Sequence, residues 1–230
     1  MSARRKRIIS VLVICALFIV ATFYVINETR IRIACVGDSI TFGAGVYETR
    51  KTESYPAYLQ DELGYEYRVL NLGKSGSTGQ KNGIYGYHLT SEYKKSLNRN
   101  NDIYIVMLGS NDAKKAFWNK EAYVSAMDEL VDLYIDIAGA ENVYLVKPPK
   151  CYPNPKDNKI LYEISDDVVR DEIGTIIETM AEEKGTKCID LYALTDGHAE
   201  YYDDGIHPNA YGNKVIAEYI GGIIQENNNK

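Results

Sequence analysis

The feature that most constrains this chain is a regular alternation of short apolar runs with longer amphipathic segments after residue 30. Five runs rich in Ile, Val, Leu and Tyr are typical of buried parallel strands. They lie at 31–36, 67–72, 102–108, 142–146 and 187–191. Helical patterns follow at about 54–63, 80–97, 119–139, 166–184 and 209–226. This order predicts an α/β fold in which helices cover both faces of a parallel sheet.

The N-terminal segment has a different pattern. Residues 8–26 carry no charge and are mostly apolar, and four basic residues precede them. A helix of this length is about 28 Å long, which matches the hydrocarbon core of a bilayer. We therefore expect a cytoplasmic basic stub and a transmembrane signal-anchor within 1–30, with domain 31–230 outside the cytoplasm. A cleaved signal peptide and a secreted domain are the alternative, although no small-x-small cleavage site follows the run.

Charge excludes one class of partner. The chain of 230 residues has a net charge of −6, but residues 1–30 alone carry +4, which leaves −10 on residues 31–230. An acidic domain repels the phosphates of nucleic acids, so we expect no nucleic-acid partner.

Polar motifs follow three of the predicted strands, and parallel α/β folds gather their sites at the carboxyl ends of strands. The first is GDSIT at 37–41, which presents the Ser39 hydroxyl at a turn. A serine at such a place is more often a cap or turn residue than a nucleophile. The second is NLGKSGST at 71–78, where the glycines let backbone N–H groups approach a ligand.

The third motif is GSND at 109–112. The side-chain amide of Asn111 is a neutral donor that suits an oxyanion. We interpret Asp112 as a turn or helix N-cap residue.

A histidine near the C-terminus completes a possible hydrolytic set. The letters DDGIHPN at 203–209 contain His207, which titrates near neutral pH and can deprotonate a serine. A carboxylate must hold the imidazole in the right tautomer. Asp204 can fold back onto the ring across the glycine turn, and Asp203 is the alternative orienting acid.

Together these four blocks resemble the SGNH branch of the GDSL family of esterases and lipases, over about residues 31–213. The resemblance implies a flavodoxin-like, three-layer α/β/α fold with a five-stranded parallel sheet, and neither a metal nor a cofactor. It also implies a role for each matching residue. Ser39 would be the nucleophile, His207 its base and Asp204 the partner of the base. The Ser39 N–H, the Gly73 N–H and the Asn111 side chain would hold the oxyanion.

The expected function is therefore that of a membrane-anchored, extracytoplasmic serine esterase. Its expected substrates are small esters or acylated carbohydrates with a short acyl group such as acetyl. The alternatives are a cell-envelope O-acetyltransferase, a lysophospholipase or thioesterase acting on lipids, and an inactive carbohydrate-binding module. Tyr85, Tyr87 and Trp118 are candidates to line the substrate pocket, with structural packing equally compatible with each.

Overall fold

The computed structural model describes residues 3–81 and 85–228. In this part of the chain five parallel strands form a sheet with the order β2-β1-β3-β4-β5. The strands are β1 (Ile31–Gly37), β2 (Tyr67–Gly73), β3 (Ile103–Met107), β4 (Val143–Lys147) and β5 (Lys187–Asp190). Each coincides with one of the predicted runs to within two residues.

The strand register brings three of the sequence motifs together. Gly37 at the end of β1 lies beside Gly73 at the end of β2 and beside Met107 at the end of β3. The loops that follow these strands therefore leave the sheet at one edge, next to one another.

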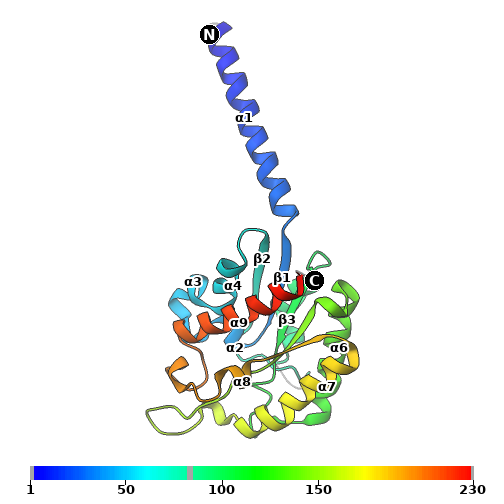
Figure 1. The fold of residues 1–230 in the computed structure, drawn as a ribbon, viewed down its shortest axis with the longest axis vertical. Helices are drawn as coiled ribbons and strands as arrows, with labels where there is room; N and C mark the ends of the chain where they lie inside the picture. Colours follow the sequence, from blue (N-terminus) through cyan, green and yellow to red (C-terminus); the bar gives the residue numbers. More distant parts are fainter. Residues whose placement is uncertain (1–2, 82–84, 229–230) are drawn as a thin grey trace.

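Helices enclose the sheet, as Figure 1 shows. The helices of the domain are α2 (Ser39–Phe42), α3 (Arg50–Glu53), α4 (Tyr55–Leu63), α5 (Ser91–Ser96), α6 (Lys120–Ala138), α7 (Gly174–Lys184), α8 (Leu191–Thr195) and α9 (Ala210–Asn228). The chain enters α7 through a π-helical stretch (Val168–Ile173), so the helix predicted at 166–184 has two parts.

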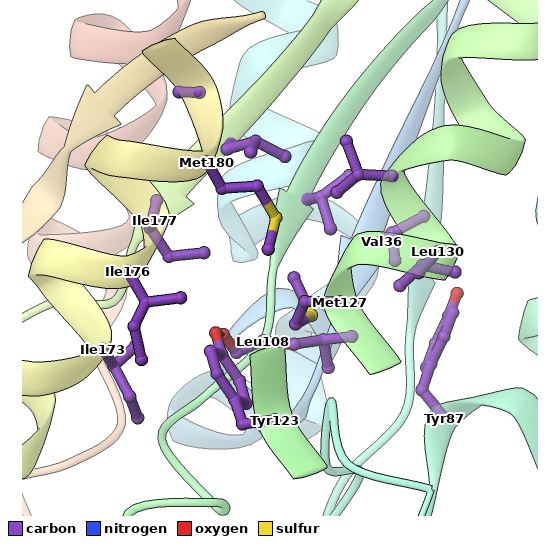
Figure 2. Packing of buried hydrophobic residues seen from close by; sticks show 14 of the residues in the cluster. Val36, Tyr87, Leu108, Tyr123, Met127, Leu130, Ile173, Ile176, Ile177 and Met180 are labelled. Atoms are coloured by element: carbon purple, nitrogen blue, oxygen red, sulfur yellow. Dashed lines mark hydrogen bonds between the residues drawn. The ribbon is translucent and has the colours of Figure 1, made fainter. Parts of the chain in front are cut away.

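The sheet has a hydrophobic core on each of its two faces, because successive strand residues point to opposite faces. On one face Ile33 and Cys35 pack with the buried residues of α4 and α9. On the other face Ala34 and Val36 pack with those of α6 and α7. Figure 2 shows side chains of α6 and α7 in this second core, with those of Tyr123, Met127, Ile177 and Met180 among them. The predicted three-layer α/β/α arrangement with a five-stranded parallel sheet is confirmed.

One predicted helix is much shorter than expected. The pattern at 80–97 contains only α5, preceded by a short 3₁₀ turn (Tyr87–Leu89), and residues 82–84 lie outside the described part. The reason is that the N–H groups of Gly79 and Gln80 donate to the carboxylate of Asp112. Gly79 and Gln80 therefore belong to a loop and not to a helix, and an isolated β-bridge between Thr78 and Gly86 joins the two ends of this loop.

The N-terminal segment also differs from its prediction. Helix α1 (Ala3–Glu28) extends away from the layered domain in Figure 1. A helix needs about 20 predominantly apolar residues to cross the hydrocarbon core of a bilayer. Among residues 3–81 and 85–228, no helix reaches the length and apolarity that a crossing requires. The prediction of a transmembrane signal-anchor over 8–26 is therefore wrong, and the membrane is not supported as a partner of this segment.

Candidate active site

Ser39 lies at the first position of α2, directly after β1. The preceding residue, Asp38, caps this helix by accepting the backbone N–H of Ile40 at 2.9 Å. The first N–H groups of a helix have no carbonyl partner within the helix. The N–H of Ser39 is one of these, so it is available to a ligand that approaches the serine hydroxyl.

The loop at 203–208 carries the base and its acid. One carboxylate oxygen of Asp204 accepts the backbone N–H groups of Ile206 at 2.8 Å and His207 at 2.7 Å. The other oxygen lies 2.7 Å from Nδ1 of His207, and Nε2 of His207 lies 3.0 Å from Oγ of Ser39. An ionised carboxylate only accepts, so Nδ1 carries the proton and Nε2 is free to accept the Ser39 O–H. The structure thus brings all three predicted residues together.

Hydrogen bonding keeps Asp204 charged. Its burial by itself would raise the pKa of this carboxyl group. Donation from the His207 ring and from the N–H groups of His207 and Ile206 outweighs burial and lowers the pKa of Asp204 to about 2. At neutral pH the residue is an anion beside the imidazole, the arrangement that stabilises an imidazolium.

The alternative acid, Asp203, lies elsewhere. Its carboxylate is 3.4 Å from Nδ2 of Asn209. Of the two neighbouring aspartates, the structure therefore places Asp204 on the His207 ring.

A close approach of two chain segments fixes the position of this loop. The N–H of Tyr152 donates to the carbonyl of Gly205 at 2.7 Å. Gly205 has a φ of +89°, and a Cβ atom on it would collide with the carbonyl oxygen of Tyr152. Only glycine combines this conformation with this contact. The turn between Asp204 and His207 is therefore held by the loop that follows β4.

A pocket of about 360 Å³ opens beside Ser39. It combines serine and amide groups with a few small apolar side chains. Its lining consists of Ser39, Ala44, Ser75, Gly76, Ser110, Asn111, Lys114, Tyr162, Ile164, Ile206 and His207.

Besides the Ser39 N–H, two further oxyanion donors were predicted, Asn111 and Gly73. Asn111 lies in the pocket lining. Its Nδ2 atom donates to the carbonyl of Ser77 at 3.1 Å and lies 3.5 Å from a carboxylate oxygen of Asp38. An amide NH₂ has two hydrogens. The bond to Ser77 fixes the orientation of the amide. The contact with Asp38 is at the long limit of a hydrogen bond, so a ligand oxygen can compete for the second N–H.

Gly73, the other predicted donor, is not part of the pocket lining among the described residues. Its N–H donates to Oδ1 of Asn71 at 3.0 Å, and a Cβ atom here would collide with the backbone N of Phe42. Gly73 therefore lets the end of β2 pack against α2. Gly76, three residues later in the same motif, does line the pocket. The motif contains two glycines, and of these the structure places Gly76 in the pocket lining.

Two buried aspartates lie behind the pocket. Burial raises the pKa of Asp38 to about 6, although the N–H of Ile40 opposes this. Burial likewise raises the pKa of Asp112 to about 6, against the N–H groups that it accepts. Asp112 lies in the turn after β3, as predicted, and its fully buried side chain also joins the loops after β2 and β3.

Sequence reasoning missed Tyr162. Its ring centroid lies 6.1 Å from that of His207, with an angle of 66° between the planes. Tyr162 and Glu163 have φ values of +60° and +56°, which cost about 1–3 kcal/mol for each non-glycine residue. The predicted aromatic candidates lie outside the pocket lining of the described chain. Tyr87 is buried and donates to the carbonyl of Leu72, Trp118 packs on Tyr123, and Tyr85 faces Phe117.

Comparison with known proteins gives the family. Residues 35–215 match the GDSL-like Lipase/Acylhydrolase family. An acetylxylan esterase of Xylanibacter ruminicola is 35% identical over 214 residues, which cover 86% of this chain. The match covers 44% of the relative, so this chain spans less than half the length of that protein.

Solved structures share the fold. The aryl esterase of M. smegmatis superposes with a TM-score of 0.69 at 23% identity, covering 85% of this chain and 99% of that one. Est24, a carbohydrate acetylesterase from Sinorhizobium meliloti, has a TM-score of 0.67 at 19% identity, covering 86% and 99%. The family match begins within β1 and extends over the other four strands and every motif described above. This chain therefore belongs to the GDSL-like lipase/acylhydrolase family, the SGNH hydrolases.

Proposed function

We propose that this chain removes short acyl groups, acetyl in the first place, from carbohydrate esters by way of an acyl-enzyme on Ser39. The observation that carries the proposal is the continuous relay from Ser39 Oγ to His207 Nε2 at 3.0 Å and from His207 Nδ1 to Asp204 at 2.7 Å. The acetylxylan esterase and the carbohydrate acetylesterase among the similar proteins support the choice of substrate.

Acylation begins at the serine hydroxyl. As Ser39 Oγ attacks the ester carbonyl carbon, its proton passes to Nε2 of His207. The ionised Asp204 stabilises the imidazolium that forms. When the tetrahedral intermediate collapses, His207 returns the proton to the leaving alcohol oxygen, and the acyl group stays on Ser39.

Deacylation repeats these steps with water. His207 takes a proton from the water, whose oxygen attacks the acyl carbonyl. Collapse releases the carboxylic acid and returns the proton to Ser39. The cycle needs no redox partner and no group other than water.

We assign the stabilisation of the oxyanion to three donors from residues that line the pocket. They are the N–H of Ser39, the side-chain amide of Asn111 and, in the role first expected of Gly73, the N–H of Gly76. Preorganised donors of this kind stabilise developing charge strongly, since they need no reorganisation during the reaction.

The pocket favours a short acyl group and a polar alcohol. Among the described residues, its apolar lining consists of Ala44, Ile164 and Ile206 beside the Tyr162 ring. A long acyl chain needs an extended apolar surface to leave water. The hydroxyl, amide and ammonium groups of the other wall suit a substrate rich in oxygen.

The decisive test uses Ser39→Ala with ethyl acetate, longer ethyl esters and acetylated xylo-oligosaccharides. We expect hydrolysis to fall by at least about 10⁴-fold, with an unchanged unfolding midpoint. Activity of the variant close to that of the unchanged protein contradicts the mechanism. A preference for long acyl chains contradicts the substrate class, and acetyl transfer to an added sugar identifies a transferase. The extracytoplasmic location stays a prediction.

A further inference from the structure

We propose that Tyr162 and Lys114 form the subsite for the sugar of the substrate. Tyr162 stacks against the pyranose ring that carries the acetyl group, and Lys114 donates hydrogen bonds to its hydroxyl groups. This inference rests on the proposed function and specifies which side chains recognise the alcohol.

The first argument is the place of Tyr162 relative to the base. His207 protonates the leaving oxygen, so a group beside the His207 ring also lies beside the alcohol of the substrate. The edge-on contact at 6.1 Å puts Tyr162 in this position. The acyl group occupies the space over Ser39, and the alcohol must extend past Tyr162.

The second argument is that the Tyr162 ring does not contribute to the core. Ile160 and Leu161 pack against the core between the sheet and α6 and α7, and Ile164 belongs to it. Tyr162 is 57% exposed although it lines the pocket. Exposed aromatic surface in a pocket is available to a ligand, and a tyrosine combines an apolar face with a polar tip.

The third argument is that the backbone holds this residue in place against its preference. The αL conformation is rare for a bulky side chain. The segment keeps it because Lys115 N–H donates to the Glu163 carbonyl at 3.2 Å and Ser165 N–H donates to the Ala113 carbonyl at 2.9 Å. Backbone strain maintained in this way is concentrated at ligand sites.

Lys114 determines which kind of ring fits. Its Nζ atom lies 5.5 Å from the Tyr162 ring centroid, and both residues line the pocket. The ammonium is partly buried and faces the charges of Asp38 and Asp112, and its burial lowers its pKa. An ammonium has three donors and no acceptor. A polyhydroxylated ring offers it several acceptors around the ring, whereas the carbon atoms of an aryl ring offer none.

The experiment compares three acetyl esters: acetylated xylo-oligosaccharides, 4-nitrophenyl acetate and ethyl acetate. Glycine adopts a positive φ without strain, so Tyr162→Gly removes the ring without adding backbone strain. We expect kcat/KM for the sugar ester to fall about tenfold or more, while that for ethyl acetate changes less than about twofold. Glu163→Gly is the matched control, since it relieves the same strain outside the pocket lining and keeps all three activities.

Lys114→Met separates a sugar from an aryl alcohol. We expect it to lower kcat/KM for the sugar ester about five- to tenfold and to leave 4-nitrophenyl acetate unchanged. The exposed neighbour Lys115 provides the control. Lys115→Met should change kcat/KM neither for the sugar ester nor for 4-nitrophenyl acetate. Lys114→Arg, which keeps charge and donors, should restore part of the loss.

The outcomes distinguish this inference from the proposed function. If Tyr162→Gly and Lys114→Met keep full activity on the sugar ester while Ser39→Ala loses it, the subsite is wrong and the mechanism stands. If Tyr162→Gly weakens sugar and aryl esters equally and Lys114→Met affects neither, the subsite does not recognise sugars. Retained activity of Ser39→Ala overturns the function itself.

Discussion

Asp204 holds His207 at two points, because one carboxylate oxygen accepts the backbone N–H at 2.7 Å and the other contacts ring Nδ1 at 2.7 Å. The same side chain therefore shapes the turn and orients the base. An asparagine keeps the carbonyl oxygen for the turn but turns an NH₂ group toward the ring.

Asp204→Asn should therefore leave the fold intact and favour the wrong tautomer of His207. We expect kcat to fall about 10³-fold or more with a small change in KM. Steady-state kinetics on ethyl acetate measure this loss. Asp203→Asn is the control and should keep its activity. A similar loss in this variant would mean that Asp204 does not orient His207 alone.

Stability should depend on Asp204 in acid. The pKa of this group is about 2 in the folded chain and 3.8 as its ordinary value. Because the folded pKa is the lower one, the stabilisation is present above about pH 4 and is lost as pH falls toward 2. With allowance for its partial exposure, the contribution is about 1–2 kcal/mol.

Urea unfolding between pH 2 and pH 5 tests this, and Asp204→Asn should lose the corresponding part of the pH dependence. A variant whose unfolding free energy follows the same pH curve as the unchanged protein would contradict the assignment.

Gly73→Ala should destabilise the domain by about 2 kcal/mol or more, because the added methyl group forces β2 away from α2. Gly222 in α9 has open space around it, so Gly222→Ala should be neutral or stabilising by up to about 1 kcal/mol. Thermal or urea unfolding of both variants gives the comparison. Equal changes in the free energy of unfolding would mean that the contact of Gly73 with α2 leaves room for a methyl group.

Asn111→Ala should remove one oxyanion donor. The expected loss is about 10²- to 10³-fold in kcat with little change in KM, since the interaction forms in the transition state. The Asn111 amide also bonds the Ser77 carbonyl, so unfolding of the variant is measured in parallel. A loss confined to KM would assign Asn111 to ground-state binding.

Much of the fold was predictable because the strands are continuous apolar runs, and their carboxyl ends determine where polar motifs meet. Ser39 and Asn111 were proposed on this basis, whereas Asp204 and His207 were proposed from their spacing in one loop and from the family resemblance. The choice between Asp203 and Asp204 needed coordinates, since both precede the same glycine turn. The choice between Gly73 and Gly76 needed coordinates too, because both glycines belong to one motif.

Tyr162 was beyond the reach of the sequence for another reason. It lies in a long connection after β4, where neither periodicity nor a motif marks it. Its position depends on backbone pairing with residues 113–115, which are about fifty positions earlier in the chain. Helix α1 shows the opposite error, because the uncharged run at 8–26 led us to predict a transmembrane helix that the structure does not support.

The buried carboxylate of Asp112 has a consequence for protein engineering. It binds the N–H groups of Gly79 and Gln80, so the loops after β2 and β3 form one mechanical unit. A graft that exchanges either loop alone would leave buried donors or a buried charge without a partner. The segment around Tyr162 is joined to its neighbours by backbone pairing instead. Libraries directed at new alcohols can therefore vary that segment on its own, while the other two loops must be transplanted as a pair.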